Sequence, residues 1–157
     1  MPDMLAGDPI NAGDFPASLS LSDVTNNDIT STVFITGTPV VAGTFMSPTS
    51  GRIFVEVGAG CYNLSGSGFE RGYAEFEVYE GTSAGGTLVH ASDNTRFRFS
   101  QGGSVGEGPY HGSRGRIVTG LTPNVTHYIR HMIARAGDTV GTTVRFTVRT
   151  LDVQAVP

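Results

Sequence analysis

Several features that often carry function are scarce or missing in this sequence of 157 residues. One cysteine is present, Cys61, so no internal disulfide framework can form. Lysine is absent, and the 10 basic residues, all arginine, are outnumbered by 14 acidic ones. The resulting net charge of −4 gives no reason to expect a nucleic-acid partner, which normally requires a basic face.

Long hydrophobic runs and targeting signals are also missing. The unbroken apolar runs are only a few residues long, so we expect no segment that spans a membrane. The opening residues, MPDMLAGDPINAGDF, lack the basic start and apolar core of a signal peptide. No stretch carries an apolar stripe of helical period over three turns, so almost no helix is expected. Together these absences predict a soluble β-protein made in a reducing cytoplasm.

What is abundant is glycine and alternating sequence. The 22 glycines are about double the usual share of roughly 7%, and they are scattered, as tight turns between short strands require. From residue 32 onward, runs of five to ten residues alternate apolar with polar side chains, as in YAEFEVYE and GRIFVEVGAG. About eight or nine such strands, separated by glycine-rich turns, predict an antiparallel β-sandwich or jelly roll over residues 31–157.

The same alternation predicts which side chains form the interior and where one strand changes register. In the last strand Leu151 and Val153 are offset by one position from Val144 and Phe146, so a β-bulge is expected near Thr150. CYNLSGSGFERG and QGGSVGEGPYHGSRG are expected to be surface loops. The predicted interior consists of Ile53, Val55, Val57, Phe76, Val78, Phe97, Phe99, Ile117, Val144, Phe146 and Val148.

Residues 1–30 differ from the rest in composition. They are rich in Asp, Asn, Pro and Ser, with isolated apolar residues that cannot pack well against one another. Such a segment is either a loose tail or an extended N-terminal arm that docks on a neighbouring subunit. The regular spacing of its apolar residues favours the arm, whose partner-binding anchors would be Leu5, Ile10, Phe15, Leu19 and Leu21.

No catalytic or metal-binding arrangement emerges from the residues. Glu75 and Glu77 share a strand face and could form an acid–base pair, but alternate glutamates on a strand usually face solvent. His127 and His131, four positions apart, lack further ligands at metal-binding spacing and are expected at a subunit contact or in solvent. Cys61 has no local cue for activation. We therefore expect no enzyme activity, no cofactor and no metal.

Two stretches resemble a known group of proteins. GTFMSPTSGRIFVEVGAG resembles the opening strand of C1q/TNF-like jelly rolls, and residues 119–157 are similar to the closing half of small jelly-roll virion proteins of actinobacterial tailed phages. AGDPINAGDF is similar to N-terminal segments of phage head and tail accessory proteins. The GLTP turn at residues 120–123 also resembles fibronectin type III domains, but the lack of tryptophan and the long preceding chain argue against one such domain.

The resemblance implies a non-enzymatic virion protein that forms a homotrimer. The first interpretation is that the protein is a decoration protein, which binds the major capsid protein on the outer surface of the phage head. Alternatives are a minor tail or collar protein that binds another virion protein, and a glycan- or receptor-binding module. For the last reading, the aromatic residues predicted in loops are the candidates: Tyr62, Phe69 and Tyr110.

Overall fold

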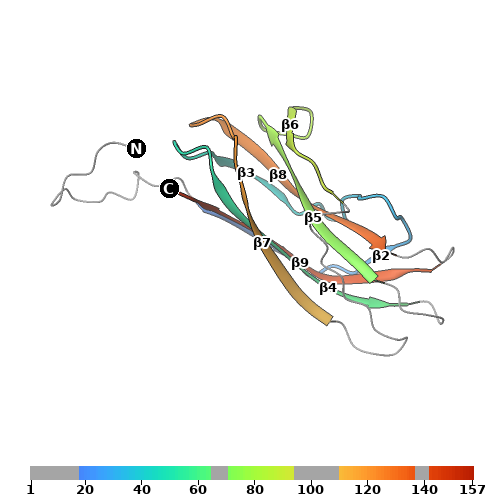
Figure 1. The fold of residues 1–157 in the computed structure, drawn as a ribbon. Coiled ribbons are helices and arrows are strands. Elements are labelled where there is room, and N and C mark those ends of the chain that lie inside the picture. The colour runs from blue at the N-terminus through green and yellow to red at the C-terminus, as the bar shows by residue number, and fades with distance from the viewer. Residues whose placement is uncertain (1–17, 65–70, 94–109, 137–141) are drawn as a thin grey trace.

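The computed structural model describes residues 18–64, 71–93, 110–136 and 142–157, and all of its regular elements are strands. Within these residues there is no helix of the length and apolarity needed to cross a membrane. Two layers of strands face each other, as Figure 1 shows. The strands are β1 (Leu19–Asp23), β2 (Asn27–Ile29), β3 (Ala42–Met46), β4 (Ile53–Asn63), β5 (Arg71–Glu80), β6 (Thr87–His90), β7 (Tyr110–Val118), β8 (Thr126–Ala136) and β9 (Val144–Ala155).

The strand order is that of a jelly roll. One sheet runs β1-β9-β4-β7, with β2 also paired to β9, and the other runs β3-β8-β5-β6. The pairs are nested along the chain: β5 with β6, β4 with β7, β3 with β8 and β1 with β9, all antiparallel. These pairs alternate between the two sheets, as when one long hairpin is rolled into a double layer. The predicted all-β antiparallel sandwich is confirmed.

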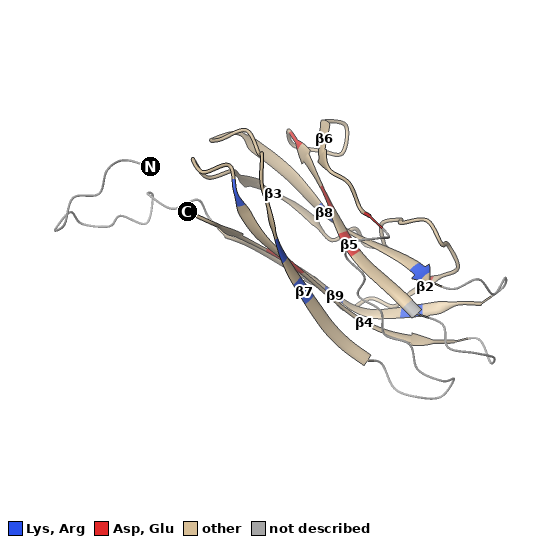
Figure 2. Ribbon diagram, viewed as in Figure 1, with Lys and Arg blue, Asp and Glu red and all other residues tan. Residues whose placement is uncertain are grey.

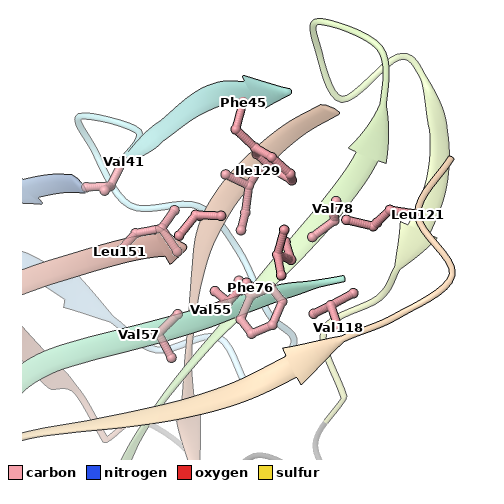
Figure 3. Close-up of a cluster of buried hydrophobic side chains, with 12 residues drawn as sticks. Val41, Phe45, Val55, Val57, Phe76, Val78, Val118, Leu121, Ile129 and Leu151 are labelled. Carbon is pink, nitrogen blue, oxygen red and sulfur yellow. The ribbon is translucent and has the colours of Figure 1, made fainter. Parts of the chain in front are cut away.

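The hydrophobic core lies between the two sheets. Its larger cluster joins β4 side chains such as Val55 and Val57 to Phe76 and Val78 of β5 (Figure 3). A second cluster, around Phe146 and Cys61, fills the end of the sandwich near β2. The structure confirms as buried these members of the predicted interior: Ile53, Val55, Val57, Phe76, Val78, Val144 and Phe146.

Four residues of the predicted interior are not confirmed as buried. Ile117 lies on the outer face of the edge strand β7 and is 47% exposed, because the inward positions of that strand pair with Val55 and Val57. Val148 is only partly buried. Phe97 and Phe99 lie outside the described residues.

The predicted bulge exists, but it lies earlier in β9 than Thr150. Gly60 pairs with Val148 and Cys61 with Phe146, so Thr147 is the extra residue. Beyond it the inward positions are Arg149, Leu151 and Val153. The prediction placed the bulge too late because Arg149, which faces inward, interrupts the apolar alternation after the bulge.

The predicted boundary at residue 30 is also corrected. β1 and β2 pair with β9, so Leu19 already belongs to the sandwich. In the chain between β2 and β3, one isolated bridge joins Ile35 to Ile133 of β8. Both predicted loops are shorter than expected, because Cys61–Asn63 extends β4 and Tyr110–Arg114 opens β7.

Candidate functional site

The predicted arm anchors divide into two groups. Leu5, Ile10 and Phe15 lie outside the described residues. Leu19 and Leu21 lie in β1, are partly buried and pack against the larger core cluster. They also contact Gly43 of β3, where an added Cβ would lie 3.1 Å from both leucine side chains. Leu19 and Leu21 therefore close one side of this chain's own sandwich, and the assignment of the five residues as anchors for a partner stays a prediction.

A buried ion pair holds β1 to the sandwich immediately after these leucines. The Arg149 guanidinium of β9 is fully buried and donates a hydrogen bond to the Asp23 carboxylate at the end of β1. Burial alone would raise the pKa of Asp23, but hydrogen bonds from Arg149 and Thr25 hold it below its usual value. The sequence analysis missed this pair, since an arginine in an alternating strand is normally placed on the solvent face.

A polar hollow of about 670 Å³ opens beside β5, at the side of the sandwich opposite β1. Its walls are Thr32–Phe34, Glu77, His90–Asp93 and Arg116. Glu77 lies on β5 and Arg116 on β7, and Figure 2 shows the acidic positions of β5 and the arginine positions of β7. The Arg116 guanidinium also lies over the Phe76 ring, 5.9 Å from its centroid, which places it at the open edge between the sheets.

The Glu77 carboxylate is held in this hollow by four hydrogen bonds. Arg130 donates to its Oε2 atom at 2.6 and 2.9 Å, Tyr79 donates to the same atom at 2.7 Å, and Ser92 donates to Oε1 at 3.0 Å. Burial would raise the pKa of Glu77, but these hydrogen bonds and the charge of Arg130 outweigh it and keep the pKa low. Glu77 is thus an ionised carboxylate whose two oxygens are both engaged.

The pKa of Glu75, which lies on the same strand face, is shifted in the opposite direction. Its side chain is fully buried, and burial raises its pKa from 4.5 to about 7. Within the described part of the chain its Oε2 atom has no hydrogen-bond partner, while Oε1 accepts only the Phe76 amide at 3.1 Å. Burial, with the charge of Arg116, also lowers the pKa of nearby His90 to about 4. The expected solvent-facing pair of glutamates is therefore wrong.

Two carboxyl groups with pKa values driven apart are the chemical basis of many acid–base sites. Here both oxygens of Glu77 accept hydrogen bonds from neighbouring side chains, and Glu75 is fully buried. Among the described residues no group of three or more His, Cys, Asp or Glu could hold a metal ion. The geometry of this hollow supports a structural role for the pair.

The two histidines of β8 were expected at a subunit contact or in solvent, and the structure corrects this. Both side chains point between the sheets and are fully buried. The His127 ring stacks on Phe45 at 5.7 Å and bonds through Nδ1 to the Val125 carbonyl at 2.9 Å. His131 donates from Nε2 to the Gly58 carbonyl in the opposite sheet, at 3.1 Å. They serve as polar links within the core.

The aromatic candidates for glycan contact are not gathered in a loop. Tyr62 ends β4, and Arg145 donates to its hydroxyl at 3.4 Å. Tyr110 begins β7 beside Cys61 and is 38% exposed. Phe69 lies outside the described residues. The two tyrosines thus occupy neighbouring strands of one sheet.

Strand order and core together define the class of this protein as a double-sheet jelly roll. One solved structure with this fold is that of infectious bursal disease virus, Gt strain: one of its chains superposes with a TM-score of 0.55 at 13% sequence identity. The match covers 99% of the present chain and 35% of the virus chain, so the present chain spans about a third of that length. At this identity the likeness concerns the fold. No protein-family model matches the sequence, and no curated protein is similar to it in sequence.

Proposed function

We propose that this chain is a non-enzymatic structural protein of a virion, and specifically a decoration protein of a tailed-phage head that binds the major capsid protein. The observation that carries the proposal is the jelly-roll strand order of the described residues, together with a superposition that covers 99% of the chain on a chain of a virus structure. Jelly rolls are common in viral shells, where a rigid sandwich presents its edges and loops to neighbours.

The chemistry of the described residues is compatible with this role. Their strongest polar interactions link one strand to another: Glu77 with Arg130, Asp23 with Arg149 and Asp28 with Arg145. Such cross-strand pairs hold a sandwich in one shape. A rigid shell with a separate attachment segment is what a decoration protein requires.

The N-terminal segment supplies the attachment in this proposal. β1 lies at the edge of its sheet, paired only with β9 among the described strands, so the chain preceding Leu19 starts from the rim of the sandwich. Leu5, Ile10 and Phe15 are the anchors that would reach the capsid protein, and their isolated spacing suits binding pocket by pocket.

The test is the number of copies in the virion. Particles of the virus that encodes this chain are purified, and its copy number is measured by quantitative mass spectrometry against the major capsid protein. Hundreds of copies per particle are the expected result. A handful of copies would replace head decoration with a minor tail or collar role, and absence from purified particles would overturn the virion assignment.

A further inference from the structure

The strand β7 is a long edge of the sandwich that the described chain leaves open. Among the described strands it pairs only with β4, and most of its 9 residues are exposed. The other edge strands are shorter: β1 and β3 have 5 residues each, and β6 has 4. The unpaired backbone N–H and C=O groups of a long edge are a template for another extended segment. β7 is therefore the described edge best suited to receive an added strand.

The charge on β7 restricts which strand can be added. Arg114 pairs in register with the buried Val57, so it lies on the inner face of β7, yet it is exposed. It forms no ion pair within the described part of the chain, and β7 itself contains no Asp or Glu. An inward-pointing charge on an edge disfavours pairing with an identical edge, because like charges would meet. The edge thus favours a strand that places an acidic residue opposite Arg114.

Residues 1–17 of this chain have the matching charge. They lie outside the described residues and contain no arginine or lysine, and their acidic residues are Asp3, Asp8 and Asp14. Proline cannot donate a backbone hydrogen bond to a neighbouring strand, so the prolines of this segment divide it. The proline-free run nearest to β1 is residues 10–15, which includes Asp14. This run has the length and the charge that the open edge accepts.

The run at residues 10–15 is too close to β1 to reach β7 of its own chain. β1 and β7 are the opposite edges of the sheet β1-β9-β4-β7. A strand added beyond β7 therefore lies four strand spacings from β1, which is about 19 Å. The chain from Phe15 to Leu19 covers at most about 14 Å when fully extended. The acceptor for this run is consequently β7 of a second copy.

We propose that residues 10–15 of one copy add as a strand to β7 of a second copy. In the antiparallel register that pairs the whole run with residues 113–118, Asp14 lies opposite Arg114 and Phe15 opposite Ser113. The contact joins different surfaces of the two copies, so it closes into a ring such as the expected trimer. The proposal concerns the free protein and does not depend on the proposed function; a capsid shell would compete for the same segment.

Light scattering of the full-length protein tests the charge pairing. We expect Arg114→Glu and Asp14→Arg each to reduce the mass from that of an oligomer to that of the single chain, 16.5 kDa. The variant that combines both changes should regain the oligomer, because the charges are exchanged. Arg52→Glu, at an exposed arginine outside β7, is the matched control and should keep the wild-type mass. A monomeric wild type, or an oligomer that both single variants preserve, would overturn the proposal.

Disulfide formation tests the register and the second copy. Asp14→Cys and Arg114→Cys proteins are mixed and mildly oxidised, and a covalent dimer is expected on a denaturing gel. Thr87→Cys, exposed on the edge strand β6, replaces Arg114→Cys as the control and should give no dimer. The native Cys61 is buried, so it does not compete. A mixture without the dimer contradicts the proposal, and so does a disulfide that closes within one chain when both changes are made together.

Discussion

Glu75 and Arg149 are charged residues that the packing of the sheets places inside the protein, and they are accommodated differently. The Arg149 guanidinium is paired with the carboxylate of Asp23, which lies against it. Glu75 has no such direct partner within the described residues, and its raised pKa shows that the fold favours its protonated form. His90 and His131, both with a pKa lowered to about 4, are favoured in their neutral form.

These shifts predict that stability rises with pH to a maximum at about pH 7. The contribution of Glu75 is fully present below its unfolded value of 4.5 and is lost as pH rises through about 7. The contributions of the two histidines are present above 6.5 and are lost as pH falls through about 4. Between pH 4.5 and 6.5 two histidines outweigh one glutamate, so stability rises with pH, and above 6.5 the remaining changes nearly cancel and the profile becomes level.

Glu75→Gln removes the contribution that opposes the histidines. The variant cannot ionise at this position, so its free energy of unfolding should rise between pH 5 and 8 by about 2–3 kcal/mol more than that of the wild type, which loses the contribution of Glu75 over this range. Urea denaturation followed by circular dichroism at pH 5, 6.5 and 8 measures both proteins. An equal change between pH 5 and 8 in the two proteins would show that Glu75 does not titrate in this range.

A second prediction at the residue scale compares two apolar side chains. Phe76 is fully buried between the sheets, so Phe76→Ala should lower the free energy of unfolding by about 3–5 kcal/mol. Ile117→Ala, on the outer face of β7, should change it by less than about 1 kcal/mol. Denaturation midpoints give both values. A large loss in Ile117→Ala would mean that the outer face of β7 is covered in solution.

At the scale of elements, β9 is the strand that holds the segment formed by β1 and β2 in its sheet. It carries two ion pairs to that segment, one buried, between Arg149 and Asp23, and one exposed, between Arg145 and Asp28. The side chains of the exposed pair are 29% and 45% accessible. The two pairs therefore join the same strand to the same segment in different surroundings, and they form a matched comparison.

We predict that Asp23→Ala destabilises the protein by about 3 kcal/mol, because it leaves the Arg149 guanidinium buried without its counter-charge. Asp28→Ala should cost less than about 1 kcal/mol, as is usual for an exposed pair screened by water. Thermal and urea unfolding of the two variants at pH 7 provide the comparison. Equal effects would indicate that β1 opens readily enough for water to reach Arg149.

At the scale of the whole molecule, the sandwich and the chain preceding it have separable tasks in the proposed function. The sandwich described here begins at Leu19, so removing residues 2–17 removes Leu5, Ile10 and Phe15 and leaves every described strand intact. Each anchor buried against a capsid would contribute about 1.5–3 kcal/mol of transfer free energy, less the cost of ordering its backbone.

The truncated protein is therefore expected to remain folded with an unchanged unfolding midpoint and to lose its binding to shells of the major capsid protein. A variant with serine at residues 5, 10 and 15 is the matched control at full length, and it should lose binding equally. Sedimentation of shells with bound protein measures occupancy. Full occupancy by the truncated form would place attachment on the sandwich and its loops.

The expected homotrimer is tested separately from attachment. A threefold assembly would cover apolar side chains that the single chain leaves exposed, such as Met46 at 56% and Leu88 at 47%. Light scattering of the purified protein should give three times the chain mass of 16.5 kDa. A monomer in solution, together with isolated single copies in a virion map, would refute the trimer.

The sequence by itself determined the fold class and most of the core. Alternation of period two is a local property of a strand, so Ile53, Val55 and Val57 could be assigned to the interior without knowledge of their neighbours. The need for a register change in β9 was visible for the same reason. Turn glycines and the absence of helical periodicity then limited the architecture to a sandwich or barrel.

Tertiary structure alone decided which charged and edge residues are covered. Glu75 follows the same alternation as a solvent-facing residue, yet its side chain is fully buried. Arg149 reads as an outward residue until the bulge at Thr147 turns it inward toward Asp23. Ile117 reads as core, but it lies on an edge strand whose outer face nothing in the described chain covers. In each case burial depends on contacts between segments far apart along the chain, and a local pattern of side chains does not encode them.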